Sequence, residues 1–344
     1  LTDACRKDSH KPPAATLGGD ILPTADTCRF LLQQAKRILS PVRIPRKERP
    51  GWLLRQRDTI HRQPRGIVGI IGTWNYPIYL NGIQILHALT AGNGVIWKPS
   101  EVAPLTAKVI HRLLLESGYP LDLIQSMEPT REGGAELVEA DIDHLVFTGS
   151  ASVGRKIATR LGERLISSTL ELSGNDLVLI LEDADVELAS RAAWFGATIN
   201  NGQTCLAARR VWVHRSRHDE LVKNLKSLID QSKGLRLALD SQCDQAQELI
   251  DDALNQGAEK IQCERCEEGT FPPTVLLKVN PSMRVFREAT FSPLLTVMPF
   301  DTIDEVLSAD CECTSALGSS ILTSDVRRGR EVALKLETGT VGRH

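Results

Sequence analysis

The chain has 344 residues, of which 42% are hydrophobic and 24% are charged, so it is long enough to form two folded domains with sizeable cores. Its formal net charge of −2 gives no reason to expect a nucleic-acid-binding protein. No uninterrupted apolar run reaches the roughly 18 residues that a membrane span needs, so we expect no membrane partner.

Eight cysteines are spaced irregularly along the chain. A chain of this size does not need disulfides, so we expect mostly reduced thiols and a cytoplasmic protein. Cys263 with Cys266, and Cys311 with Cys313, are the pairs that a zinc site would use. Neither segment contains a histidine, and "CERCEE" is typical of a polar surface turn, so we favour surface thiols and predict no metal.

The first half of the chain alternates between strand-like and helix-like segments. Residues 1–25 are polar and rich in proline, which predicts a loose arm. Residues 28–39 carry apolar side chains at helical spacing. The elements predicted next are strands at 66–71, 94–98 and 144–148 and helices at 103–118 and 152–161.

The second half repeats this alternation, which predicts a doubly wound, mostly parallel, Rossmann-like α/β sheet followed by a second α/β domain. The pattern restarts near residue 173 and so divides the chain into residues 1–172 and 173–344. The predicted elements are strands at 169–173, 177–181, 209–214, 274–279, 294–300 and 319–323, and helices at 185–200 (capped by Asp185), 217–231, 303–310 and 324–337.

Two stretches in the first half are candidates for nucleotide binding. In "LVFTGSASVG" a strand passes through Gly149 and Ser150 into a helix, whose free N–H groups and dipole suit a phosphate. A tight turn without a ligand explains this stretch equally well. In "WKPSE", Lys98 and Glu101 follow a strand end and are suited to hold ribose hydroxyls, although a solvated loop has the same composition.

Three further residues are candidates for catalysis. Glu171 lies between leucines in "TLELS", where desolvation would raise its pKa toward that of a general base, but the alternation also fits a solvent-facing strand residue. Asn75 in "GTWNYP" is an amide donor for an oxyanion or an ordinary turn residue. Cys205 in "NNGQTCLAARR" is a nucleophile, with Gly202 permitting close approach, or a small buried hydrophobe.

Taken together and in this order, these stretches resemble the aldehyde dehydrogenase family over roughly residues 60–342. The matching motifs also include "REATFSPLLTV" and "LGSSILT". The "NYP" and "GQTC" forms are similar to the shorter, class-3-like branch. The resemblance implies an NAD-dependent enzyme, with NADP also possible, that oxidises an aldehyde to its carboxylic acid. Residues 1–172 would then be the arm and dinucleotide-binding domain, and residues 173–344 the catalytic domain.

The resemblance also implies a role for each matching residue. Cys205 would attack the aldehyde to give a thiohemiacetal and then a thioester, Asn75 would hold the oxyanion, and Glu171 would activate the hydrolytic water. The implied cofactor-binding residues are Trp74, Lys98, Glu101, Gly149, Ser150, Gly154 and Phe291. The carboxylate of Glu101 favours NAD, because it would repel the 2′-phosphate of NADP.

Some positions depart from the family pattern. Ala289 stands where a second glutamate often holds the nicotinamide ribose, and Thr73 replaces a usual proline. Family members continue beyond "GTVGRH" with a segment that pairs across the subunit interface, so we expect the C-terminal end and the oligomerisation segment to be missing. A homo-oligomer is usual for the family. The alternative functions are a non-catalytic binding or structural protein with this fold, and a CoA-acylating relative, against which Glu171 argues.

Overall fold

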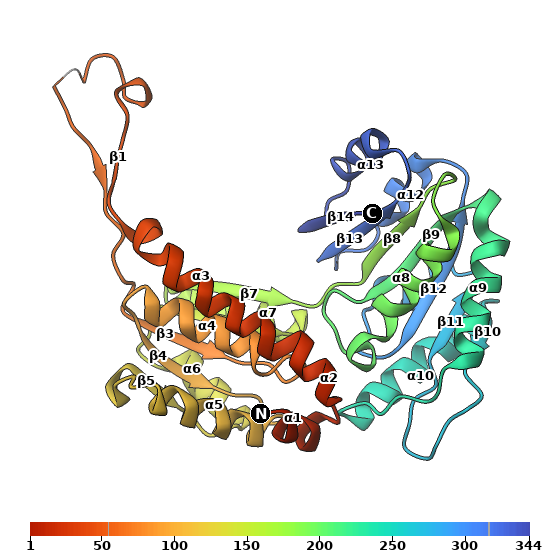
Figure 1. The fold of residues 1–344 in the computed structure, drawn as a ribbon, viewed down its shortest axis with the longest axis horizontal. Coiled ribbons are helices and arrows are strands. Elements are labelled where there is room, and N and C mark those ends of the chain that lie inside the picture. The colour runs from red at the N-terminus through yellow and green to blue at the C-terminus, as the bar shows by residue number, and fades with distance from the viewer. Residues whose placement is uncertain (54, 316) are drawn as a thin grey trace. The chain divides into compact units, whose positions relative to one another are not determined.

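In the computed structural model, residues 1–53, 55–315 and 317–344 are described, and they form two compact units. The first unit spans Leu1–Glu171 and the second spans Leu172–His344 (Figure 1). This division falls one residue before the boundary predicted after residue 172. The functions assigned to the two halves, cofactor binding and catalysis, stay predictions.

The first unit is built on a five-stranded sheet with the strand order β5-β4-β3-β6-β7. Its central strand reads IVGII, and residues 68–71 are buried, as expected for a strand covered on both faces. It pairs in parallel with β4 and β6, and β4 pairs in parallel with β5. The strands are β3 (Ile67–Ile71), β4 (Gly94–Lys98), β5 (Ile124–Ser126), β6 (His144–Gly149) and β7 (Ser167–Leu172).

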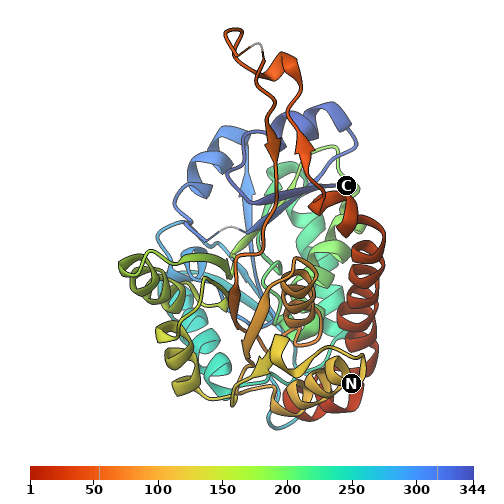
Figure 2. The same cartoon turned by 90° about the vertical axis from the view of Figure 1, so that its left-hand side faces the viewer.

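Helices cover both faces of this sheet, which makes it doubly wound as predicted. In Figure 2, red α3 and orange α4 lie on one side of the sheet, and yellow-green α6 and α7 lie on the other. A short antiparallel hairpin, β1 (Val42–Arg43) with β2 (Thr59–Ile60), also belongs to this unit. The helices are α1 (Thr2–Ser9), α2 (Pro13–Thr16), α3 (Leu22–Leu39), α4 (Tyr79–Thr90), α5 (Pro104–Glu116), α6 (Arg131–Glu139) and α7 (Ala151–Glu163).

The prediction of a loose arm over residues 1–25 is wrong, because this segment is helical and packs onto the first unit. Cys5 is completely buried in the core cluster that contains Trp97. Asp8 accepts hydrogen bonds from the backbone N–H and the hydroxyl of Thr106, and so helps to cap α5. These partners are 98 positions apart in the chain, so the local polarity of the segment carries no sign of them.

The second unit has a seven-stranded sheet with the order β10-β11-β12-β9-β8-β13-β14. All neighbouring strands pair in parallel except β10, an edge strand that runs antiparallel to β11. The strands are β8 (Asp176–Ile180), β9 (Ala208–His214), β10 (Glu259–Gln262), β11 (Thr274–Leu277), β12 (Leu294–Phe300), β13 (Gly318–Leu322) and β14 (Thr340–Arg343).

This second sheet is also covered on both faces. One buried cluster joins β8 and β9 to α8 and α9, and another joins the sheet to α10, α12 and α13. Asp185 caps α8 as predicted, because its carboxylate accepts from the N–H of Leu188 at 3.0 Å. The helices are α8 (Val186–Thr198), α9 (His218–Gln231), α10 (Asp240–Asn255), α11 (Arg284–Arg287), α12 (Ile303–Asp310) and α13 (Val326–Ala333).

The strands and helices predicted between residues 66 and 337 are all present, with ends shifted by a few residues. The elements that the prediction missed are α4, α6, α10, α11, β1, β2, β5, β10 and β14. Helix α6 contains two adjacent glycines and β10 reads EKIQ, so neither has the composition that ordinarily marks its element. Among the described residues, no helix is both long and apolar enough to cross a membrane.

Candidate active site and cofactor cavity

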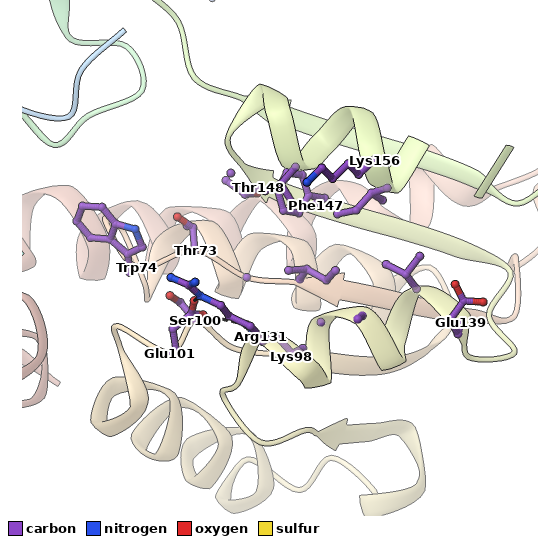
Figure 3. Close-up of a pocket in the computed structure, with 18 residues that line it drawn as sticks. Thr73, Trp74, Lys98, Ser100, Glu101, Arg131, Glu139, Phe147, Thr148 and Lys156 are labelled. Atoms are coloured by element: carbon purple, nitrogen blue, oxygen red, sulfur yellow. Dashed lines mark hydrogen bonds and ion pairs between the residues drawn. The ribbon is translucent and has the colours of Figure 1, made fainter. Parts of the chain in front are cut away.

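A cavity of about 740 Å³ opens in the first unit where β3, β4 and β6 end (Figure 3). Ligands of open, parallel α/β sheets bind at this edge, beyond the carboxyl ends of the strands. Four of the predicted cofactor residues line the cavity, namely Trp74, Lys98, Glu101 and Gly149. The sequence motifs that follow these three strands therefore meet around a single cavity.

One wall of the cavity carries a small network of charges. The ammonium of Lys98 lies 3.1 Å from a carboxylate oxygen of Glu101, and Arg131 Nε lies 3.5 Å from the other oxygen. Figure 3 shows these three side chains close together. Burial opposes the ionisation of Glu101, but hydrogen bonds from the backbone, Lys98 and Arg131 outweigh it and lower the pKa of this carboxyl. An ionised acceptor is thus present where ribose hydroxyls would bind.

The turn after β6 packs tightly and leads directly into α7. A Cβ at Gly149 would lie 2.5 Å from Cζ of Phe147, so this position accepts only glycine without rearrangement. Ser150 caps α7 by accepting from the N–H of Val153. Ser150 is the N-cap of α7 and Gly154 lies in its first turn. Neither residue is among the described residues that line the cavity. Their contact with a phosphate stays a prediction.

Asn75 lies in a buried loop after β3, where its side-chain amide is held in one orientation. The hydroxyl of Thr73 donates to Asn75 Oδ1 at 2.9 Å, and the backbone carbonyl of Asn75 accepts from Lys11 Nζ at 3.1 Å. Thr73 contacts the oxygen end of the amide, and the other end, Nδ2, is the hydrogen-bond donor. This is the end that an oxyanion requires.

Cys205 follows a loop with an uncommon backbone conformation. Asn200, Asn201 and Gly202 have φ of 51°, 58° and 79°, all in the left-handed region that asparagine and glycine tolerate best. Gln203 Nε2 donates to the carbonyl of Asn200 at 3.1 Å and braces the loop from within. A Cβ at Gly202 would lie 2.3 Å from the carbonyl carbon of Ser292, so glycine is needed for this packing, whereas the predicted close approach of a substrate stays a prediction.

The thiol of Cys205 is half-buried, unlike those of Cys5, Cys263 and Cys313, which are buried. The interpretation of Cys205 as a small buried hydrophobe is therefore wrong. Its backbone carbonyl accepts from the N–H of Gly174 at 3.3 Å, so the loop is tied to the segment before β8. Its role as nucleophile stays a prediction.

Glu171 is exposed, so of the two interpretations of "TLELS" the solvent-facing strand residue is confirmed and the carboxylate buried among leucines is wrong. It lies in β7, at one edge of the five-stranded sheet, where exposed and half-buried residues alternate from Thr169 to Leu172. Period-two alternation places Glu171 on the open face of the strand. It is the last residue of the first unit, and its role as a base stays a prediction.

The remaining predicted residue, Phe291, belongs to the second unit and is half-buried in the segment after α11. The adjacent Ala289 is also half-buried. Glu288 forms an ion pair with Arg284 at 2.8 Å. Contact of Phe291 with a cofactor stays a prediction.

Sequence reasoning missed three residues that the structure brings to these sites. Arg131 and Lys156 line the cavity, from α6 and α7. Arg209 is 3% exposed and contacts the Cys205 loop. Arg131 and Lys156 each lie in the first two turns of a helix that follows a strand of the sheet. A charged residue at that place is the sequence signal that could have indicated their position at the cavity. A pair of arginines inside an apolar strand was the signal for Arg209.

The cysteine pairs show no sign of a metal site. Cys263 is buried and Cys266 is exposed, and Cys266 Sγ lies 3.6 Å from the carbonyl oxygen of Cys263. In the part of the chain that the structure describes, no group of three or more histidine, cysteine, aspartate or glutamate side chains could hold a metal ion.

Comparison with proteins of known sequence gives relatives along nearly the whole chain. A 4,4′-diapolycopene aldehyde oxidase of a Methylomonas species is 33% identical over an alignment 348 residues long, which covers 98% of this chain and 65% of that protein. A benzaldehyde dehydrogenase of Bacillus subtilis is 31% identical over an alignment 314 residues long, which covers 88% of this chain and 65% of that protein. The chain thus spans slightly less than two thirds of the length of these relatives.

Solved structures give the same fold. The NAD⁺ complex of an aldehyde dehydrogenase from Bacillus cereus superposes with a TM-score of 0.93 at 30% identity, covering 100% of this chain and 72% of that one. An NADP-dependent glyceraldehyde-3-phosphate dehydrogenase from Bacillus halodurans, complexed with NADP, gives a TM-score of 0.92 at 30% identity, covering 99% and 73%.

The model of the aldehyde dehydrogenase family matches residues 1–343. The α/β fold, the motif order around the cavity and these comparisons agree. The chain belongs to the aldehyde dehydrogenase family.

Proposed function

We propose that the protein oxidises an aldehyde to its carboxylic acid with NAD(P)⁺. The observation that most supports this function is the half-buried Cys205, held on a loop of left-handed residues in a chain that matches the family over residues 1–343. The proposal requires that an incoming carbonyl reach this thiol. The cavity at the strand ends of the first unit is the proposed cofactor site.

In this proposal the protein's own groups carry the steps at the carbonyl. The sulfur of Cys205 attacks the aldehyde carbon and forms a thiohemiacetal, whose oxyanion accepts hydrogen bonds from Asn75 Nδ2 and from the Cys205 backbone N–H. A bound NAD(P)⁺ supplies the acceptor for the hydride that the aldehyde carbon loses. Glu171 takes a proton from the water that hydrolyses the resulting Cys205 thioester, which releases the acid and restores the thiol.

The cavity fits a nicotinamide dinucleotide by the chemistry of its lining. Glu101 and Lys98 would hold ribose hydroxyls, and the turn at Gly149 with the start of α7 would hold phosphate oxygens. The ionised Glu101 favours NAD⁺, because a carboxylate repels a 2′-phosphate. Arg131 lies against the same carboxylate and partly offsets this repulsion, so NADP⁺ is the second candidate.

The test is turnover with NAD⁺ and a panel of aldehydes, followed by the absorbance of the reduced cofactor. The panel includes benzaldehyde and a long polyene aldehyde, because relatives at 31% and 33% identity carry names with such substrates. Cys205→Ser is expected to abolish activity. Glu171→Gln is expected to release one equivalent of reduced cofactor per site and then stall. Steady turnover of that variant at the wild-type rate would show that Glu171 is not the base.

The same assay separates the alternative functions. A non-catalytic protein with this fold would give no signal with any aldehyde while remaining folded. A CoA-acylating enzyme would turn over only after CoA is added. We further propose a cytoplasmic protein with a small-molecule aldehyde as substrate. The homo-oligomer that the family resemblance implies stays a prediction, which light scattering would test.

A further inference from the structure

Two adjacent arginines open β9 just after the Cys205 loop. Neighbouring residues of a strand point to opposite faces, so the two side chains have different surroundings. Arg210 donates to the carbonyl of Asn175 at 2.8 Å and to the carboxylate of Asp310 at 2.7 Å. Arg209 is 3% exposed and has other partners.

The guanidinium of Arg209 binds the backbone of the Cys205 loop directly. Its Nη2 donates to the carbonyl of Gly202 at 2.5 Å and to that of Thr204 at 3.4 Å. Its Nη1 donates to the carbonyl of Ser292 at 2.5 Å. Ser292 is also the residue against which Gly202 packs. One buried side chain therefore ties the loop that carries Cys205 to the segment that supports it.

Arg209 also carries a positive charge to the residue next to Cys205, because its Nη2 donates to the carbonyl of Thr204. Burial lowers the pKa of Arg209 to about 10, against the opposing effects of Asp176 and Cys205, so the guanidinium stays charged at neutral pH. Among the described residues, the hydrogen bonds of Arg209 go to neutral carbonyls and none goes to a carboxylate. Asp176 and Cys205 are the two ionisable groups whose charge acts on it.

We propose that Arg209 is a positioning residue for Cys205, which fixes the loop through three carbonyls and stabilises the thiolate by its positive charge. The thiolate is the nucleophilic form of cysteine, and a nearby opposite charge favours ionisation. The inference rests on the proposed function, in which Cys205 is the nucleophile. The ionisation of its thiol is nevertheless measurable without turnover.

The experiment is the pH dependence of Cys205 alkylation by iodoacetamide, followed by mass spectrometry of the Cys205 peptide. Arg209→Met is expected to raise the pH midpoint of alkylation by about one unit. Arg209→Lys keeps the charge and is expected to hold the midpoint near the wild-type value, while lowering kcat through loss of the three-carbonyl geometry. Arg210→Lys is the matched control, because Arg210 is an equally buried arginine on the opposite face of β9. In this variant the pH midpoint of Cys205 alkylation is expected to be unchanged.

An unchanged midpoint in folded Arg209→Met overturns the charge role. Equal shifts in the Met and Lys variants overturn it too, because a purely structural role responds to both. If Arg209→Met does not fold, the wild type still decides: Cys205 should alkylate at a lower pH than the exposed Cys311, and a midpoint at or above that of Cys311 contradicts the proposal. The two proposals can fail separately. If the protein has no dehydrogenase activity but its variants still show these shifts in the alkylation midpoint, the proposed function is wrong and the role of Arg209 stands.

Discussion

Lys11 and Asp20 form a fully buried ion pair beneath the loop that carries Asn75, with side chains 1% and 0% exposed. The Lys11 ammonium also lies 3.7 Å from the centroid of the Tyr76 ring. Asp20 accepts from the backbone N–H groups of Ile78 and Tyr79, at the start of α4. The N-terminal segment therefore holds the proposed oxyanion loop at Asn75 and at its junction with α4.

Removing one member of this pair should destabilise the first unit. Lys11→Met leaves the Asp20 carboxylate buried without its cation, which costs roughly 3–5 kcal/mol. For a unit of this size we expect the thermal midpoint to fall by roughly 5–15 °C. Differential scanning calorimetry measures it. The control is Arg6→Met, which removes an exposed ion pair with Asp3 and should leave the midpoint unchanged. Equal midpoints for Lys11→Met and the wild type would contradict the role given to the pair.

The first unit also shows how far the sequence could predict this fold. Strands β3 and β4 and helix α5 follow from periodicity and end signals, because burial on both faces of a parallel strand leaves an uninterrupted apolar run. The Lys11–Asp20 pair and its contact with Asn75 join residues up to 64 positions apart. No local pattern encodes such a contact, so residues 1–25 looked like an unattached polar arm.

The candidate site was predicted to the extent that its residues follow strand ends. Lys98, Glu101 and Gly149 meet at one cavity because the carboxyl ends of parallel strands share an edge of the sheet. The sequence left open whether Glu171 is buried among leucines or faces solvent, and the position of β7 at the sheet edge leaves this residue exposed. Sheet order is a property of the whole chain, so the alternation in "TLELS" alone did not decide between the two faces.

Thr73 should matter to catalysis through the orientation of Asn75. Thr73→Val removes the hydroxyl that donates to Asn75 Oδ1 and so removes one of the contacts that orient the amide. We expect kcat to fall by about tenfold with little change in KM, because an oxyanion donor acts mainly in the transition state. Thr73→Ser keeps the hydroxyl and should restore most of the rate. Steady-state kinetics on both variants test this, and a fully active, folded Thr73→Val would remove Thr73 from the positioning of the amide.

Glu101 should control the choice between the two cofactors. Glu101→Gln removes the carboxylate that would repel a 2′-phosphate but keeps the shape of the side chain. It also leaves the cations of Lys98 and Arg131 without their shared anion. We expect the affinity for NADP⁺ relative to NAD⁺ to rise by about tenfold, since such a carboxylate contributes on the order of 1.4 kcal/mol. Thermal-shift titration with each cofactor measures the ratio. An unchanged ratio would show that Glu101 does not meet the ribose.

Asp176 should make stability depend on pH near neutrality. Burial raises the pKa of Asp176 from 3.8 to about 6, against the opposing effects of two backbone N–H groups and of Arg209 and Arg210. Because its pKa is higher in the folded state, the stabilising contribution of its protonated form is fully present below pH 3.8 and is lost as the pH rises through about 6. The loss is on the order of 3 kcal/mol.

Asp176→Asn isolates this effect, since an amide does not titrate. We compare the thermal midpoint of the wild type with that of the variant at each pH. The difference, wild type minus variant, should decrease as the pH is raised from about 4 to about 7, whatever its absolute value. Asp301→Asn is the control. The exposed carboxylate of Asp301 pairs with Arg215, which lowers its pKa. Asp301 is therefore ionised above about pH 5 in the folded and in the unfolded protein. That difference should stay flat from pH 5 to pH 7. A difference for Asp176 that grows with pH would mean that Arg209 and Arg210 stabilise the carboxylate more than burial disfavours it.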